Sequence, residues 1–226
     1  MSDTVASSVA TTVADDYLKT ICQHTEWQPE PITPSQLAVA LALAPSSVTE
    51  MVKKLAAAGL VDHRPYGAIT LTDAGRTRAL AMLRRHRLIE TWLVERHDYG
   101  WDEVHDEAEV LEHALSDRLL DRIDAELGHP TRDPHGDLIP RKDGTIIRPD
   151  AVRLDAAAAG TAGAVVRISD RDPEVLREID ALEITLDERV RVAESPSDSD
   201  AVALQRASGR TIVVDASVAR AIWLAV

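Results

Sequence analysis

Residue types that would support other protein classes are scarce in this 226-residue chain. Its single cysteine, Cys22, excludes a disulfide framework and a cysteine-based zinc cluster. Phenylalanine is absent and aromatic residues make up only 3%, so the core must be built from Ala, Leu, Val and Ile. No apolar run approaches the roughly 18 residues of a membrane-spanning helix, and no basic-then-apolar leader occurs. We therefore expect a cytoplasmic protein without a membrane partner.

Acidic residues outnumber basic ones, but not evenly along the chain. The net charge is 25 − 38 = −13, yet residues 1–90 carry nine Lys and Arg against nine Asp and Glu. Residues 91–226 carry sixteen against twenty-nine and hold the whole excess. Residues 31–89 contain eight bases and three acids, a local balance of +5. A basic segment in an acidic chain is typical of a DNA-binding module joined to an acidic regulatory part.

Residues 1–74 follow the order of a winged helix-turn-helix. Apolar spacing predicts a helix over 4–24, and Thr33-Pro34 is a helix-start signal for a short helix to residue 41. A further helix is predicted over 45–58, and residues 60–71 hold two strand-like runs around a Pro/Gly turn. Helix, short helix, turn, helix and β-hairpin is the order of a winged helix-turn-helix. An all-α core with an incidental hairpin is the alternative.

The remainder divides into a helical domain, residues 75–143, and a mostly β domain, residues 144–226. Thr72 is placed to cap a long helix to residue 97, and two helices are predicted over 102–114 and 117–127. Residues 129–149 are rich in Pro, Gly, Asp and Arg, which indicates a linker. Strands are predicted at 164–168, 189–193, 202–205 and 210–214, with a helix near 173–180. The fold class is mixed and mainly α.

Two helix faces gather metal-ligating residue types. His86 and Glu90 are spaced i, i+4, while His105, Glu109, Glu112 and His113 project from one side of the next helix. Two such faces packed together without a cation would be costly, because their polar groups would be buried unpaired. Carboxylate and imidazole without thiolate suit Mn²⁺, Fe²⁺, Co²⁺ or Zn²⁺, and oxygen-rich sites favour Mn²⁺. A solvated, charged helix face is the alternative.

The chain resembles the diphtheria-toxin-repressor family of metal-dependent transcriptional repressors, and within it the manganese-responsive branch. The resemblance rests on residues 15–21, 45–55, 71–75, 85–90, 104–108 with Glu112-His113, and 134–140. It implies a winged helix-turn-helix, a helical dimerisation and metal-sensing domain, and a C-terminal SH3-like domain.

The resemblance also implies two metal sites. The family's regulatory site falls on Asp16, Glu109, Glu112 and His113. Iron-responsive members carry a methionine and a cysteine where this chain has Asp16 and Glu109, so the carboxylates favour manganese. The ancillary site falls on His86, Glu90 and His105, with Asp172 as the nearest further ligand and Glu174 as the next. Four further histidines without a partner at ligand spacing are expected at the surface: His63, His97, His129 and His135.

DNA contacts are expected from the helix that begins at Pro45. Its first turns would enter the major groove with Ser46, Ser47, Thr49 and Glu50. Glu50 either accepts a hydrogen bond from a cytosine amino group or forms a salt bridge with Lys53 or Lys54. The expected phosphate contacts are Lys53, Lys54, Arg64 and Tyr66.

The resemblance thus implies a Mn²⁺-activated repressor with one or two ions per subunit, controlling manganese uptake or homeostasis genes. It would bind a palindromic double-stranded operator as a homodimer, with the regulatory ion tying Asp16 to the dimerisation domain. The nearest alternative is an Fe²⁺-activated repressor of iron-uptake genes with the same fold. A metal-dependent hydrolase built on Glu112 and His113 is a distant alternative, since no nucleophile or spare general base accompanies them. We expect no enzymatic activity.

Overall fold

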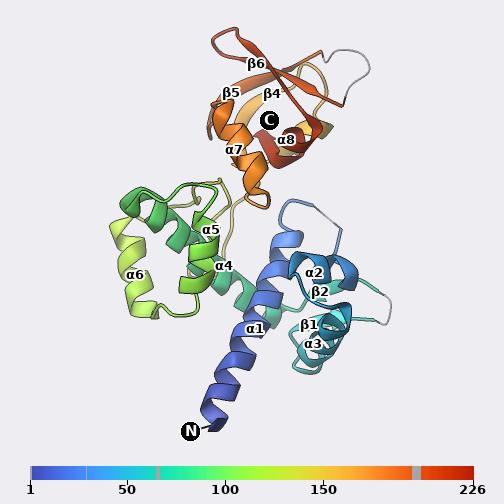
Figure 1. Ribbon diagram of the computed structural model, residues 1–226, viewed down its shortest axis with the longest axis vertical. Helices are drawn as coiled ribbons and strands as arrows, with labels where there is room; N and C mark the ends of the chain where they lie inside the picture. Colours follow the sequence, from blue (N-terminus) through green and yellow to red (C-terminus); the bar gives the residue numbers. More distant parts are fainter. Residues whose placement is uncertain (1, 29, 65–66, 195–199) are drawn as a thin grey trace. The chain divides into compact units, whose positions relative to one another are not determined.

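The computed structural model describes residues 2–28, 30–64, 67–194 and 200–226. Tyr66, an expected phosphate contact, lies outside the described residues. The chain forms two compact units, Met1–Arg85 with Pro140–Thr145, and His86–Ile139 with Ile146–Val226 (Figure 1). The helix α4, Asp73–His97, contributes residues to both units. The domain boundaries at residues 74 and 143 stay a prediction.

The first unit is a winged helix-turn-helix. Its elements are α1 (Ser2–His24), α2 (Pro34–Ala40), α3 (Pro45–Ala57), β1 (Val61–His63) and β2 (Ile69–Leu71). The two strands pair antiparallel, with Val61 opposite Leu71, and form the wing hairpin. The buried side chains of this unit include Tyr17, Leu18, Ile21, Ile32, Leu37, Val48, Val52, Leu55 and Ile69. The predicted order of elements is confirmed.

Local signals in the sequence explain where these helices begin. The Thr33 side chain accepts a hydrogen bond from the Gln36 N–H, and Gln36 binds back to the Thr33 backbone, which completes a capping box. Thr72 accepts from the Gly75 N–H at the start of α4. Gly75 is required for close packing, because a Cβ there would lie 1.9 Å from the Leu60 carbonyl oxygen.

The helical part of the second unit consists of the C-terminal half of α4, α5 (Val104–Leu111) and α6 (Asp117–Glu126). Ser116 caps α6 by accepting from the Leu119 N–H, as its position predicts. The core between these helices is formed by Leu88, Ile89, Leu93, Val104, Ala108, Leu120 and Ile139. This packing places one face of α4 against α5.

The β part of the second unit is an antiparallel sheet, with strand order β3-β8-β4-β5-β6-β7 in the described residues. The strands are β3 (Ala151–Arg153), β4 (Ala162–Ile168), β5 (Arg189–Ala193), β6 (Val202–Arg206), β7 (Thr211–Val214) and β8 (Ile222–Ala225). A short 3-10 helix (Leu154–Ala156), α7 (Pro173–Ala181) and α8 (Ala216–Ala221) complete it. Buried residues of α7 and α8 pack with the sheet in one core.

The segment predicted as a linker contains a buried loop. Asp133, His135 and Asp137 are 6%, 0% and 4% exposed. The Asp133 carboxylate accepts hydrogen bonds from the N–H groups of His135 and Asp137, so the loop satisfies its own backbone and can be buried. The expectation that His135 lies at the surface is therefore wrong.

Candidate metal centre

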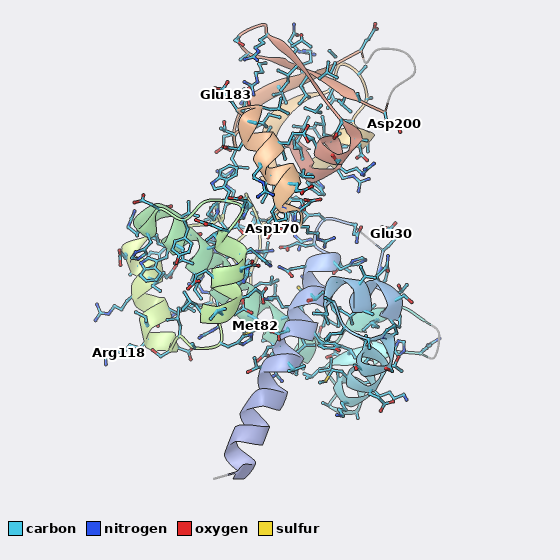
Figure 2. All side chains as sticks on the ribbon, in the orientation of Figure 1. Glu30, Met82, Arg118, Asp170, Glu183 and Asp200 are labelled. Carbon is cyan, nitrogen blue, oxygen red and sulfur yellow. The ribbon has the colours of Figure 1, made fainter. Side chains whose placement is uncertain are left out.

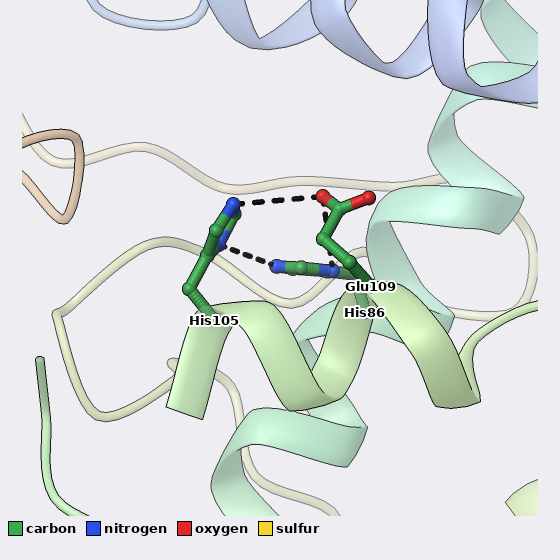
Figure 3. Close-up of side chains that lie close together, drawn as sticks. All are labelled: His86, His105 and Glu109. Carbon is green, nitrogen blue, oxygen red and sulfur yellow. Dashed lines mark hydrogen bonds and ion pairs between the residues drawn. The ribbon is translucent and has the colours of Figure 1, made fainter. Parts of the chain in front are cut away.

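The facing sides of α4 and α5 bring together the residues of the predicted ancillary site. His86 is 1% exposed and Glu90 is 1% exposed. The His86 Nε2 lies 3.0 Å from Glu90 Oε1 and 3.2 Å from His105 Nδ1. Figure 3 shows His105 and Glu109 on the same side of α5, pointing toward His86, with His105 Nε2 3.5 Å from Glu109 Oε1. Glu90, His105 and Glu109 therefore surround the buried imidazole of His86.

His86 also contacts a carboxylate of the predicted regulatory site. Its Nδ1 lies 2.6 Å from Oε2 of Glu112, a side chain that is fully buried. The other Glu112 oxygen lies 3.3 Å from His113 Nε2. Three of the four predicted regulatory residues, Glu109, Glu112 and His113, therefore stand at the C-terminal end of α5. Asp16 is a partly buried residue of α1 in the first unit.

A set of buried groups around Glu90 was missed by the sequence argument. Glu90, Asp133 and His135 each offer a ligand atom within 4.8 Å of one another, and all three are buried. His135 Nε2 lies 3.1 Å from the Trp101 carbonyl oxygen, to which an Nε2–H donates. Its Nδ1 is buried and has no hydrogen-bond partner among the described residues. A neutral imidazole with that tautomer presents the lone pair by which histidine binds metal.

Burial and neighbouring charges shift the pKa values of both carboxylates in this set. Burial opposes ionisation of Glu90, but the charge and hydrogen bonds of His86 and His105 hold its pKa well below the usual value. Burial and the nearby charges of Asp137 and Glu90 raise the pKa of Asp133 well above the usual value. A divalent cation would satisfy both carboxylates and the orphaned His135 nitrogen at once, so the donor set fits a metal ion.

The third domain contributes Asp170 to this region in place of Asp172. Asp170, labelled in Figure 2, lies in the turn after β4, with Oδ2 3.6 Å from His105 Nδ1. Glu90, His105 and Asp170 form a further group of possible ligands. Asp172 instead caps α7, accepting from the N–H groups of Glu174 and Val175. An aspartate immediately before a proline at the first helical position is an N-cap signal, so the sequence could have separated the two roles.

The predicted DNA-contact residues that the structure describes lie on α3 and, for Arg64, directly after β1. The described members of the set are all exposed: Ser46, Ser47, Thr49, Glu50, Lys53, Lys54 and Arg64. Thr49 Oγ1 donates to the Pro45 carbonyl, and Glu50 Oε1 accepts from Lys53 Nζ at 2.8 Å. The salt-bridge alternative for Glu50 is therefore the arrangement in the DNA-free chain.

Comparison with known proteins assigns the family. Residues 10–69 match the iron dependent repressor N-terminal DNA binding domain, residues 72–141 its metal binding and dimerisation domain, and residues 152–226 the FeoA domain. The iron-dependent repressor IdeR of Mycobacterium leprae is 35% identical over 159 residues, covering 66% of this chain and 68% of that protein. The chain belongs to the iron-dependent, or diphtheria-toxin, repressor family.

Solved structures of manganese-dependent repressors are also similar to this repressor. A manganese-dependent transcriptional repressor in complex with manganese is 50% identical with a TM-score of 0.87, covering 94% of this chain and 99% of that one. The manganese regulator SloR is 30% identical with a TM-score of 0.77, over 93% and 97% of the two chains. The chain is thus a metal-dependent transcriptional repressor with a DNA-binding, a metal-binding and dimerisation, and a FeoA domain.

The domain matches locate the candidate ligands within the repressor. Glu90, Asp133 and His135 fall in the metal binding and dimerisation match, and Asp170 falls in the FeoA match.

None of the described helices of the repressor combines the length and apolar character that a membrane crossing requires.

Proposed function

We propose that this repressor is activated by Mn²⁺, binds a palindromic operator as a homodimer and controls manganese uptake or homeostasis genes in the cytoplasm. The observation that carries the proposal is the buried donor set around Glu90, which offers carboxylate oxygens and the orphaned His135 nitrogen but no thiolate. Oxygen-rich sites with imidazole suit Mn²⁺. The 50% identity to a manganese-dependent repressor supports the same metal.

The regulatory ion in this proposal is held by Asp16, Glu109, Glu112 and His113. Asp16 belongs to the first helix of the DNA-binding domain, and the other three belong to the helical domain. An ion bound by all four would restrict motion between these domains. In a two-fold dimer it would hold the two α3 helices at the spacing of two half-sites. By linkage, DNA must then tighten metal binding by the same factor, typically ~1–3 kcal/mol.

The second ion in this proposal is held by Glu90, Asp133 and His135, with His105 and Asp170 beside them. Relative to the sequence prediction, Asp170 takes the place of Asp172, and two residues of the buried loop are added. His86 stands between the two sets, with one ring nitrogen facing Glu90 and the other Glu112. A cation here would give the third domain a share in metal sensing through Asp170.

The regulatory site is tested by the matched variants Asp16→Ala and Asp15→Ala. Both remove a carboxylate from adjacent positions of α1, but Asp15 is paired with Arg78 of the same unit. We expect Asp16→Ala to abolish the Mn²⁺-stimulated part of operator binding in fluorescence anisotropy, with the dimer retained in sedimentation velocity. Asp15→Ala should keep the metal response. Equal metal stimulation in Asp16→Ala and the wild type would refute this ligand assignment.

The second ion is tested by measuring how many Mn²⁺ ions each subunit binds. Titration of the chain with Mn²⁺, followed by the electron paramagnetic resonance signal of free Mn²⁺, should give two ions per subunit in the wild type. His135→Phe keeps an aromatic ring but removes the Nδ1 ligand, so it should leave one tightly bound ion. A count of two in His135→Phe would remove His135 from the site.

Iron activation is the second candidate, favoured by the 35% identity to an iron-dependent repressor. The two are separated by operator binding measured with Mn²⁺, with anaerobic Fe²⁺ and without metal. Tighter operator binding with Mn²⁺ alone supports the proposal. A stronger response to Fe²⁺ would mean that this repressor is activated by iron. We also propose that the metal acts as a corepressor and not as a catalyst, so metal-dependent hydrolysis of phosphate or carboxylate esters would contradict it.

A further inference from the structure

The buried loop of Asp133 and His135 is held between two buried arginines, one from α4 and one from β4. Arg87 is 2% exposed and Arg167 is 7% exposed. Asp137, at the end of the loop, faces both: its Oδ1 lies 2.7 Å from Arg167 Nε and 3.8 Å from Arg87 Nη2. One carboxylate thus joins the helical domain to the third domain through the loop.

Further contacts fix each arginine in place. Arg87 Nη1 donates to the Leu138 carbonyl at 2.6 Å, and its Nε lies 3.6 Å from Asp133 Oδ2. The Arg167 guanidinium lies over the Trp223 ring, 4.4 Å from its centroid. The loop backbone is attached to the same strand, since the Ile168 N–H donates to the His135 carbonyl at 2.8 Å.

The loop backbone packs closely against β4 at Gly136. Gly136 has φ +89°, in the left-handed region that favours glycine. A Cβ at this position would lie 2.2 Å from the Val166 carbonyl oxygen. The backbone at Gly136 and the side-chain contacts of the two arginines therefore both hold Asp133 and His135 in place against β4.

Such a buried charge network is a poor source of stability. Removing three charged groups from water costs about as much as their mutual attraction returns, and apolar residues of similar size often serve stability better. What the network does supply is a fixed geometry. Arg167 lies three residues before Asp170, and Asp137 lies two residues after His135, so the network borders the candidate ligands from both domains.

We propose that Arg87, Asp137 and Arg167 form a clamp that positions Asp133, His135 and Asp170 around the second cation. Asp137 and Arg167 are then positioning residues, which bind no metal themselves. Arg87 is shared between the two aspartates, with Nε 3.6 Å from Asp133 Oδ2 and Nη2 3.8 Å from Asp137 Oδ1. This inference rests on the second ion of the proposed function.

Arg167→Met tests the clamp because electrostatics and positioning predict opposite results. Removing a positive charge near a cation site strengthens cation binding by Coulomb's law. Loss of positioning weakens it, and we expect about tenfold lower Mn²⁺ affinity for the second ion, in the range seen when groups that orient ligands are removed. The first ion should bind as in the wild type. Isothermal titration of the full chain with Mn²⁺ alone measures both affinities.

Hydrogen exchange of the metal-free chain gives a readout that does not depend on metal. We expect the backbone amides of residues 130–140 and 165–172 to exchange about tenfold faster in Arg167→Met. In the wild type, local opening of these segments must break the contacts of the clamp, and in the variant those contacts are missing. Arg167→Lys keeps the charge and one donor, and should recover part of both effects. Arg153→Met is the matched control: it removes an exposed pair with Asp155 in the same domain and should behave as the wild type.

The outcomes separate the clamp from the second ion. Unchanged or tighter binding of the second ion in Arg167→Met, or unchanged exchange, overturns the clamp. If the wild type binds one ion only, the second ion of the proposed function fails and the role of the clamp in metal binding fails with it. The exchange rates then decide only whether Arg167 holds the loop against β4. If Arg167→Met does not fold, Asp137→Asn replaces it and is evaluated by hydrogen exchange of the metal-free chain alone, because the loss of a negative charge lowers cation affinity by itself. Unchanged exchange of residues 130–140 and 165–172 in Asp137→Asn would overturn the clamp.

Discussion

Glu50 and Lys53 form an exposed ion pair on the face of α3 that is expected to meet DNA. The hydrogen bond and charge of Lys53 lower the pKa of Glu50, so the pair persists through neutral and mildly acidic pH. In the free chain the carboxylate offsets part of the lysine charge. Glu50 therefore reduces the attraction of α3 for phosphates unless it finds a partner on a base.

We expect Glu50→Gln to tighten binding to operator and to unrelated DNA alike, because it removes a negative charge facing the phosphates. The slope of log affinity against log salt should steepen by up to about one counterion. Anisotropy at several salt concentrations measures this, with Glu178→Gln on the exposed face of α7 as the control. A loss of preference confined to one base pair, without the general gain, would instead show that Glu50 reads a cytosine.

Individual candidate ligands were predictable where they follow helix periodicity and not where they lie in loops. The spacing of His86 with Glu90, and of His105 with Glu109, places each pair on one helix face, and the structure brings the two faces together. Asp133, His135 and Asp170 follow no period, and their approach depends on long-range packing of a loop against β4. Asp133 and His135 have one local signal, the density of Asp and His around Gly136, and Asp170 does not share it.

At the scale of elements, helices with caps were predicted to within a few residues, whereas short strands near the ends of the third domain were not. The strands β3 and β8 and the helix α8 were not predicted. β3 passes directly into the 3-10 helix at Leu154, and α8 passes directly into β8 at Ile222, so no turn residue separates these elements in the sequence. The helix α8 does carry a cap: Asp215 accepts hydrogen bonds from the N–H groups of Ser217 and Val218. Its residues Val218 and Ala219 are buried in the domain core.

We expect Asp215→Ala to lower the free energy of unfolding by about 1 kcal/mol at pH 7, the usual cost of losing an N-cap. Hydrogen bonds from Ser217 and the Val218 backbone lower the pKa of Asp215 in the folded chain. A lowered pKa means that this stabilisation is present above about pH 4 and fades as the pH falls through the folded value. Urea unfolding at pH 7 and near pH 3.5 should show the gap between wild type and variant closing.

Asp215→Asn is the control for the capping interpretation, since asparagine caps about as well as aspartate. It should retain most of the stability at pH 7 and show less dependence on pH. A variant gap that stays constant down to pH 3.5 would contradict the assigned role of the carboxylate.

At the scale of the whole molecule, the apolar residues left at the surface bear on assembly. Val110 on α5 is 69% exposed and Leu119 on α6 is 43% exposed, and both lie in the metal binding and dimerisation match. Their neighbours Ala108 and Leu120 are buried in the core. Each of the two helices therefore packs one apolar face in the core and also exposes an apolar side chain. Other exposed apolar side chains of the described residues lie outside this match, among them Val39, Leu43 and Val213. The position of Val110 and Leu119 within the dimerisation match is what makes them candidates for a subunit interface.

If Val110 lies in the interface of the proposed homodimer, we expect Val110→Lys to weaken that dimer by at least about tenfold, because a charge buried at an apolar interface without a partner is costly. Sedimentation velocity across a concentration series measures the dimer dissociation constant, and Val213→Lys, at a residue 54% exposed on β7, is the matched control. Binding to a palindromic operator should fall with the dimer, since one subunit reaches only one half-site. Mn²⁺ binding within the second unit should persist, because Glu90, Asp133, His135 and Asp170 all come from one chain. Loss of the second ion together with the dimer would mean that this site needs the partner subunit.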